Sequence, residues 1–149
     1  MSSVIISITA NKQNNFIPDE HSALLIVDVQ NDFCPGGALP VSCGNEVVPV
    51  LNEYITRFRN MRLPIFASRD WHPKETRHFA SSGGLWPEHC VQDTFGAEFH
   101  TDLRLPTNTI VITKGTAYDQ DSYSAFNGED FGNEMFVDVL KSGTVDHQF

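Results

Sequence analysis

The sequence predicts an α/β fold of three layers, built around a parallel sheet. Residues 23–29 are almost continuously apolar, as in a strand that is buried on both faces of a parallel sheet. Two further short runs, 65–68 and 109–113, have the same character, and an amphipathic helical pattern separates the first run from the second. Strand, helix, strand, long insertion, strand and helix is an order typical of α/β domains.

The chain begins with a segment that is polar apart from one short apolar run. We expect residues 1–20 to form a loose N-terminal arm or a short edge strand, and residues 21–149 to form one domain, truncated at its C-terminal side. The first main strand follows at 23–29. Residues 30–44 read as a loop because they contain Pro35, two glycines and Pro40.

A helix is predicted after this loop. Asn45 is a suitable cap, and Pro49 falls about one turn later, where a missing N–H does least harm. Apolar residues then recur every three to four positions, which makes one apolar stripe along the helix. The stripe consists of Val47, Val48, Leu51, Tyr54, Ile55, Phe58 and Met61.

The second and third main strands are predicted at 65–68 and 109–113, parallel to the first and adjacent to it. Residues 69–108 between them form a connection far longer than usual, and long loops of this kind are often functional. A last helix is predicted over 133–141, with Gly143 as its stop.

Composition excludes several classes of partner. The chain has 149 residues and a net charge of −9, with ten Lys and Arg against nineteen Asp and Glu, so a basic face for nucleic acid or an anionic membrane is not available. Three cysteines, Cys34, Cys43 and Cys90, are too few and odd in number for a secreted disulfide framework. With no signal peptide or membrane span in the sequence, we expect a cytoplasmic protein.

Histidines are concentrated in one stretch of the chain. Asp70 and His72 are two residues apart, so on extended backbone they point the same way, and His78 and His89 follow within twenty residues of Asp70. Imidazole with one carboxylate suits zinc, iron or manganese better than calcium or magnesium. The alternative is that these are unrelated surface histidines, but their clustering favours a metal site.

Three predicted strands end beside ionisable residues. Asp28 lies at the end of the first, Asp70 follows the second and Lys114 follows the third. Ligands of open α/β sheets bind at the carboxyl ends of the strands. We therefore expect one converging site, with Asp28 and Lys114 within a few ångströms of each other.

Five segments in order resemble the nicotinamidase (pyrazinamidase) family of isochorismatase-like cysteine hydrolases. The first, Ile26–Phe33 followed by Cys34–Gly37, resembles the first-strand motif of that family. The others are Ser68–Pro73, Trp86–Cys90, Ile112–Gly115 and Tyr123–Phe126. The resemblance implies an isochorismatase-like sheet and hydrolysis of nicotinamide to nicotinic acid and ammonia, a step of NAD salvage.

The resemblance also implies roles for individual residues. Asp28 would be the general acid and base, and Lys114 the cation that holds the catalytic triad and tunes its thiol. One divalent transition metal, zinc first with iron or manganese as alternatives, would anchor a small pyridine carboxamide. Its ligands would be Asp70, His72, His78 and His89. The pocket for the pyridine ring would be walled by Phe33, Trp86 and Tyr123.

The chain departs from the family pattern in one respect. The family's nucleophilic cysteine follows a later strand, in a segment that this sequence does not contain, and Cys34 and Cys90 do not match its motif. Three readings stay open: an incomplete nicotinamidase, a non-enzymatic form that binds metal and ring, or another cysteine hydrolase of the same superfamily. We expect the 149 residues to bind metal without hydrolysing nicotinamide. We also expect the chain to be marginally stable or to form homo-oligomers through an unpaired edge of the first main strand.

Overall fold

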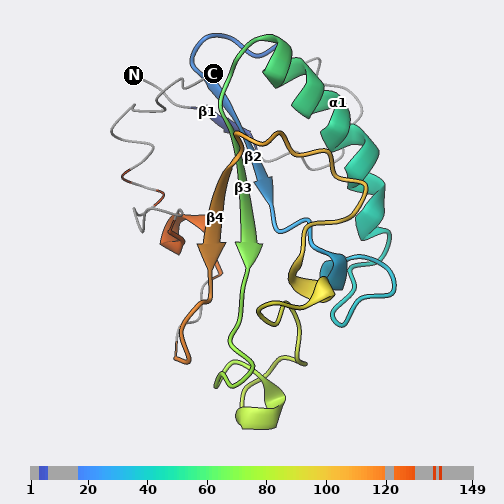
Figure 1. The fold of residues 1–149 in the computed structure, drawn as a ribbon, viewed down its shortest axis with the longest axis vertical. Coiled ribbons are helices and arrows are strands. Elements are labelled where there is room, and N and C mark those ends of the chain that lie inside the picture. The colour runs from blue at the N-terminus through green and yellow to red at the C-terminus, as the bar shows by residue number, and fades with distance from the viewer. Residues whose placement is uncertain (1–3, 7–16, 120–122, 130–135, 137, 139–149) are drawn as a thin grey trace.

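The computed structural model describes residues 4–6, 17–119, 123–129, 136 and 138, and is drawn in Figure 1. Within these residues, four parallel strands form one sheet in the order β1-β2-β3-β4, and their bounds are Val4–Ile6, Ser22–Val27, Ile65–Asp70 and Ile110–Lys114. The helix α1, Val47–Asn60, covers one face of this sheet (Figure 1). The predicted parallel α/β fold is confirmed, and the three main strands lie within two residues of their expected bounds.

Alternation along the strands sorts apolar side chains to the two faces. Leu24, Ile26, Ile65 and Ala67 face α1 and form one core with its buried side chains. That buried side of the helix consists of Val48, Leu51, Ile55 and Phe58. Met61, expected in the same stripe, is 43% exposed because it lies just past the last turn.

The opposite face of the sheet carries a second, smaller core. Phe66, Ile112, Ala125 and Phe136 are buried together there, beside the short 3-10 turn Ala125–Asn127. Positions 136 and 138 are helical, in agreement with the expected last helix, but the rest of 133–141 lies outside the described residues. Among the described residues, no helix combines the length and apolar character needed to cross a membrane.

Two local expectations need correction. Asn45 does not cap the helix, because it lies inside the 3-10 turn Gly44–Glu46, and Glu46 takes the cap position without a side-chain hydrogen bond. The outer edge of β2 is also not fully unpaired. The β-branched run Val4–Ile6 pairs with Ser22–Leu24, so the alternative of a short edge strand at the N-terminus is confirmed.

The connection between β3 and β4, residues 71–109, is called the insertion below. It contains two short 3-10 turns, Ala80–Ser82 and Phe95–Ala97, and no named strand. Its first part gathers beyond the carboxyl ends of β3 and β4, and its second part returns along the α1 side (Figure 1). The insertion therefore lies where a parallel sheet binds its ligands.

Candidate active site and metal centre

Three strand ends bring a lysine between two carboxylates. Asp70 and Lys114 are opposite each other in the register of β3 and β4, and Asp28 follows the end of β2. Lys114 Nζ lies 2.9 Å from Asp28 Oδ2 and donates a hydrogen bond to Asp70 Oδ1. The predicted proximity of Asp28 and Lys114 is confirmed.

Lys114 is a buried cation, with 3% of its surface exposed. Burial by itself lowers the pKa of Lys114, but the charges of Asp28 and Asp70 and their hydrogen bonds outweigh it, and the pKa is raised. The ammonium therefore stays protonated at neutral pH. It neutralises part of the charge of two carboxylates that would otherwise repel each other.

Asp28 is held in a strained backbone conformation. Its φ is 52°, in the left-handed region that an aspartate adopts only at a cost, and strain of this kind is concentrated at functional sites. Its N–H donates to the Ser68 carbonyl at 3.1 Å, and its own carbonyl accepts from the Gln30 N–H at 2.9 Å. The Ser68 hydroxyl donates to Asp28 Oδ1 at 2.7 Å, so both carboxylate oxygens are fixed.

Three buried histidines form a group next to this ion cluster. His72, His78 and His89 each offer a nitrogen, and these nitrogens all lie within 4.8 Å of one another. Backbone pairing explains the approach, since the His72 N–H donates to the Cys90 carbonyl at 2.9 Å and so brings His89 alongside. Asp70, the fourth expected ligand, lies beside the group rather than within it. Its Oδ2 is 3.9 Å from His72 Nε2.

Hydrogen bonds fix the tautomers of two of these rings. His72 Nδ1 is 3.1 Å from the Gly115 carbonyl, and His89 Nδ1 is 2.7 Å from the Pro87 carbonyl. A carbonyl only accepts, so each Nδ1 carries a proton, and Nε2 is the nitrogen that each ring offers to a ligand. Metal-binding histidines are usually oriented by such a partner on the second nitrogen.

His72 Nε2 is buried without a hydrogen-bond partner among the described residues. Burial, followed by the neighbouring His89 and His78, lowers the pKa of His72 to about 4, so this ring is neutral at pH 7. An unpaired, neutral and buried nitrogen next to two other imidazoles fits a divalent metal ion of the transition series. The donor set of the site and such an ion therefore match.

The backbone behind His72 requires glycine at position 115. Its φ is +67°, and a Cβ placed there would lie 2.5 Å from His72 Cε1. Glycine therefore allows the chain to turn after β4 while its carbonyl still reaches the imidazole.

The aromatic residues expected to wall the pocket surround the histidines. The Phe33 ring lies 5.6 Å from that of His89, and Trp86 is stacked at 6.3 Å on His78. The Tyr123 ring is 6.0 Å from His78, and its hydroxyl accepts a hydrogen bond from Trp86 Nε1 at 3.2 Å. Tyr123 is 71% exposed and Trp86 36%, so this wall faces outward.

Two of the three cysteines are buried, and burial opposes their ionisation. Burial raises the pKa of Cys34. Burial and then the charges of Asp70, Asp32 and Asp28 raise the pKa of Cys90 strongly, because a thiolate there would face three carboxylates. Cys43 is exposed in the left-handed backbone that precedes the turn before α1.

Sequence reasoning gave no role to three polar residues that the site uses. Ser68 binds the Asp28 carboxylate, and Gln30 and Asp32 bind the backbone of the segments that carry the histidines. A signal was present, because Ser68 is polar within an apolar strand. Gln30 and Asp32 also lie inside a motif that otherwise drew attention only to Asp28 and Phe33.

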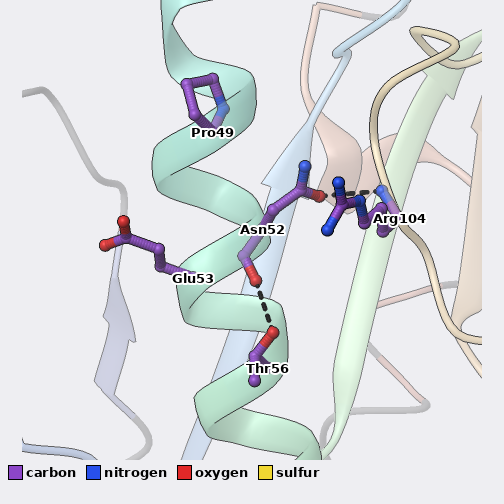
Figure 2. A pocket seen from close by; sticks show the side chains of 5 residues that line it. All are labelled: Pro49, Asn52, Glu53, Thr56 and Arg104. Atoms are coloured by element: carbon purple, nitrogen blue, oxygen red, sulfur yellow. Dashed lines mark hydrogen bonds between the residues drawn. The ribbon is translucent and has the colours of Figure 1, made fainter.

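A separate shallow cavity of about 440 Å³ lies on the helix layer (Figure 2). Its lining residues are Pro49, Asn52, Glu53, Thr56 and Arg104. The Asn52 carboxamide there accepts from the Arg104 N–H at 2.8 Å and donates to the Asp102 carbonyl at 2.9 Å. These bonds attach the insertion to α1, and none of the expected site residues lines the cavity.

Comparison with known proteins gives related enzymes. Residues 22–146 match the family model described as the isochorismatase domain. The nicotinamidase of Acinetobacter baylyi is 41% identical over 120 residues, which cover 70% of this chain and 54% of that protein. This chain thus spans about half the length of that curated relative.

Solved structures of similar fold come from the same group of enzymes. A pyrazinamidase of Pyrococcus horikoshii in complex with zinc superposes with a TM-score of 0.73 and 44% identity, over 81% of this chain and 64% of that one. PnC1 from L. infantum in complex with nicotinate gives a TM-score of 0.69 and 36% identity, over 80% of this chain and 60% of that one.

Proposed function

We propose that this chain, which belongs to the isochorismatase family, carries the metal-binding and substrate-binding side of a nicotinamidase site. The reaction would be hydrolysis of nicotinamide to nicotinic acid and ammonia, within NAD salvage. One observation carries the proposal above the others: three buried imidazoles converge beside an Asp28–Lys114 pair. The similarity to nicotinamidases and to a nicotinate complex supports the same substrate class.

A divalent metal ion would be held by the three histidines, with Asp70 as a fourth ligand or as a partner of the ligands. Zinc is the first candidate, since three imidazoles and a carboxylate suit it and a similar pyrazinamidase was solved with zinc. Iron and manganese are the alternatives. When bound, the metal would supply a Lewis-acid anchor for the pyridine nitrogen, directly or through a water molecule.

The substrate ring would lie among Phe33, Trp86 and Tyr123, which surround His78 and His89. Aromatic side chains suit a flat heteroaromatic ring because they stack with it at little cost in conformational entropy. The carboxamide would then point towards Asp28 and Lys114.

The proton and charge chemistry would belong to Asp28 and Lys114. The Asp28 carboxylate would take the proton of the thiol, the resulting thiolate would attack the amide carbon, and ammonia would leave with that proton from Asp28. Asp28, then ionised, would take a proton from the water that hydrolyses the thioester, which releases nicotinic acid and restores the thiol. Lys114 would hold Asp28 in place and favour the thiolate by its charge.

The thiolate is the part that these 149 residues do not supply in our proposal, because Cys34 and Cys90 do not match the family's cysteine motif and both are buried. Removal of a covalent nucleophile usually costs many orders of magnitude in rate. We therefore propose that the chain by itself binds metal and ring without detectable hydrolysis. The reading as a purely non-enzymatic form is less favoured, since the relatives are nicotinamidases.

The test combines two measurements on the purified 149-residue chain. Elemental analysis after growth in metal-replete medium should find about one equivalent of a transition metal. Ammonia release from nicotinamide should be undetectable, and should appear when residues that carry a cysteine nucleophile are supplied in the same chain or by a partner chain. Clear release by the 149 residues that is lost in Cys34→Ala or Cys90→Ala, and kept in Cys43→Ala, would contradict the assignment of roles.

Two further parts of the proposal concern assembly and location. Residues 21–149 would act as one domain in the cytoplasm. The stretch of β2 beyond Leu24, whose outer edge β1 does not reach, would pair with another strand, from a second copy or from the same protein. Val27, at the end of this stretch, is 50% exposed, which is unusual for valine in the middle of a sheet.

A further inference from the structure

Three consecutive polar side chains after β2 bind backbone groups of β3 and of the insertion. Gln30 Oε1 accepts a hydrogen bond from the Asp70 N–H at 2.8 Å. Gln30 Nε2 donates to the carbonyl oxygens of Asp70 at 2.7 Å and Ala97 at 2.8 Å. Asn31 Nδ2 donates to the Phe95 carbonyl at 2.8 Å. Backbone groups at the end of β3 and in the insertion are thus satisfied by side chains.

Asp32 binds backbone N–H groups of two other loop segments. Its Oδ2 accepts from the Cys90 N–H at 2.7 Å, and its Oδ1 accepts from the Ala38 N–H at 3.0 Å. Cys90 has a φ of 46°, so the bond from Asp32 secures a backbone conformation that a cysteine rarely adopts. Gly96 packs directly on the same carboxylate, since a Cβ there would lie 2.2 Å from Asp32 Oδ2.

These contacts fall on the two segments that carry the candidate ligands. Gln30 holds the backbone of Asp70, two residues before His72. Asp32 holds the backbone of Cys90, directly after His89. Both come from one short turn that begins at Asp28, so a single piece of chain spans the catalytic carboxylate and both ligand-bearing segments.

The burial of Gln30 indicates how specific its role is. Gln30 is 0% exposed, and burying a carboxamide is unfavourable unless its donors and its acceptor are all used. The two carbonyls and the N–H that it contacts use both donors and the acceptor, and they also fix which end of the amide is oxygen. An apolar side chain of similar size would fill the space but could not set the position of Asp70.

We infer that Gln30, Asn31 and Asp32, called the bracket here, are positioning residues that hold His72 and His89 at the spacing required by a metal ion. Gln30 and Asp32 act through the backbone of Asp70 and Cys90, and Asn31 supports them by binding the backbone of Phe95 in the insertion. This inference rests on the metal site of the proposed function. Partners of this kind behind metal ligands typically change metal affinity by about 10-fold to 100-fold when they are removed.

Two nearly isosteric variants and one matched control test the bracket. Gln30→Glu replaces the donors to two carbonyls with an oxygen that repels them. Asp32→Asn replaces one acceptor with an NH₂ group that cannot accept from an N–H. Asn52→Asp is the control, because Asn52 also uses its carboxamide to bind the backbone of the insertion, but on α1 beside the surface cavity (Figure 2).

The measurement is Co²⁺ binding to the metal-free 149-residue chain, followed by visible absorbance, with melting temperatures in chelator recorded alongside. The unmodified chain should bind about one equivalent with the spectrum of a low-symmetry site. Gln30→Glu and Asp32→Asn should bind at least about tenfold more weakly with an altered spectrum. Asn52→Asp should keep the Co²⁺ affinity and spectrum of the unmodified chain, even if its melting temperature falls as far as those of the two bracket variants.

Each outcome decides between the inferences. If the unmodified chain binds no Co²⁺, the proposed metal site is refuted, and the bracket loses its role with it. If that chain binds but both bracket variants match it, only the bracket is refuted. Equal losses in Asn52→Asp would also refute the bracket, because the loss would then follow general stability. Should Gln30→Glu not fold, Asp32→Asn decides alone, since one of its acceptor oxygens remains.

Discussion

The helix-covered face of the sheet and the loops at its carboxyl end are held together by different interactions. Between α1 and the sheet, apolar side chains such as Leu24, Ile55 and Phe58 are buried against one another. At the carboxyl end, Lys114, Gln30 and three histidines are buried, and hydrogen bonds and ion pairs hold these polar groups while a buried phenylalanine packs on the histidine rings. The same small domain thus uses one kind of packing for stability and another for its site.

This difference has a physical reason. Apolar burial stabilises in proportion to the area removed from water and depends little on direction, so it tolerates small shifts of the helix. A hydrogen bond weakens steeply outside a narrow range of distance and angle. Side chains that must meet at a metal ion are therefore better fixed by Gly115, Pro87 and the bracket than by apolar packing.

The largest effect is expected on the helix side. Phe58 is 1% exposed within the α1 core, and Phe58→Ala removes most of that side chain and leaves a cavity. The free energy of unfolding in chelator should fall by about 3–5 kcal/mol, measured by urea denaturation. Zinc affinity of the folded fraction should be unchanged. A parallel loss of zinc affinity would show that the two regions are not separate.

A slightly smaller loss is expected for Lys114→Met. This change leaves Asp28 and Asp70 without their buried cation, and should lower the free energy of unfolding by about 3 kcal/mol at pH 7. Because the pKa of Lys114 is raised by folding, its contribution is fully present below the ordinary value of 10.5 and is lost only as pH rises through the folded value.

The pH dependence of this variant gives a second check. The contribution of Lys114 is present below its ordinary pKa of 10.5 and is lost as pH rises through the raised folded value. The deficit of Lys114→Met relative to the unmodified chain should therefore be similar at about pH 7 and pH 9 and shrink at higher pH. Urea denaturation in chelator at these values measures the deficit, and a deficit that grows with alkaline pH would contradict the role of Lys114.

The fold could be predicted largely from the sequence because its signals are local. The apolar run of β2 and the helical period of α1 are both visible within one element, and the structure places both within one or two residues. Expectations based on one residue were less successful. Asn45 is a good cap by type, but the preceding 3-10 turn moved the start of α1 past it.

The candidate site was predicted in part for a related reason. Asp28 and Lys114 lie at strand ends, and parallel strands bring their ends together by topology alone. Topology does not place Gln30 and Asp32, although both lie inside the first-strand motif, because the backbone groups that they bind in β3 and beside His89 are 40 or more residues away in the chain. The displacement of Asp70 towards Lys114, rather than into the histidine group, depends on the same long-range geometry.

A smaller effect on stability but a clear effect on metal is expected for His72→Ala. Zinc affinity should fall by about 100-fold, or about 2.7 kcal/mol, because the removed Nε2 is a candidate ligand. Excess zinc should raise the melting temperature of the unmodified chain and barely affect that of the variant. His21→Ala, at an exposed position outside the group, is the control. Equal zinc binding by both variants would contradict the metal site.

The smallest effects are expected for alanine substitutions at two glycines, which distinguish a side-chain contact from backbone strain. Gly96→Ala would place a methyl group 2.2 Å from Asp32 Oδ2, in a backbone conformation that alanine accepts. Gly83→Ala is the converse, since Gly83 has a φ of +90° but nothing within 4 Å of the added carbon. If the loops depend on directional contacts, Gly96→Ala should weaken zinc binding about tenfold by displacing Asp32 from Cys90.

Gly83→Ala should instead lower the free energy of unfolding by about 1 kcal/mol through strain and leave zinc affinity as it was. Isothermal titration with zinc and urea denaturation in chelator, on the same two variants, measure both quantities. The reverse pattern, with zinc binding lost in Gly83→Ala and kept in Gly96→Ala, would mean that backbone strain rather than the Asp32 contact sets the metal site. The site would then differ from the apolar helix face in its dependence on turn conformation, and not in its dependence on directional contacts.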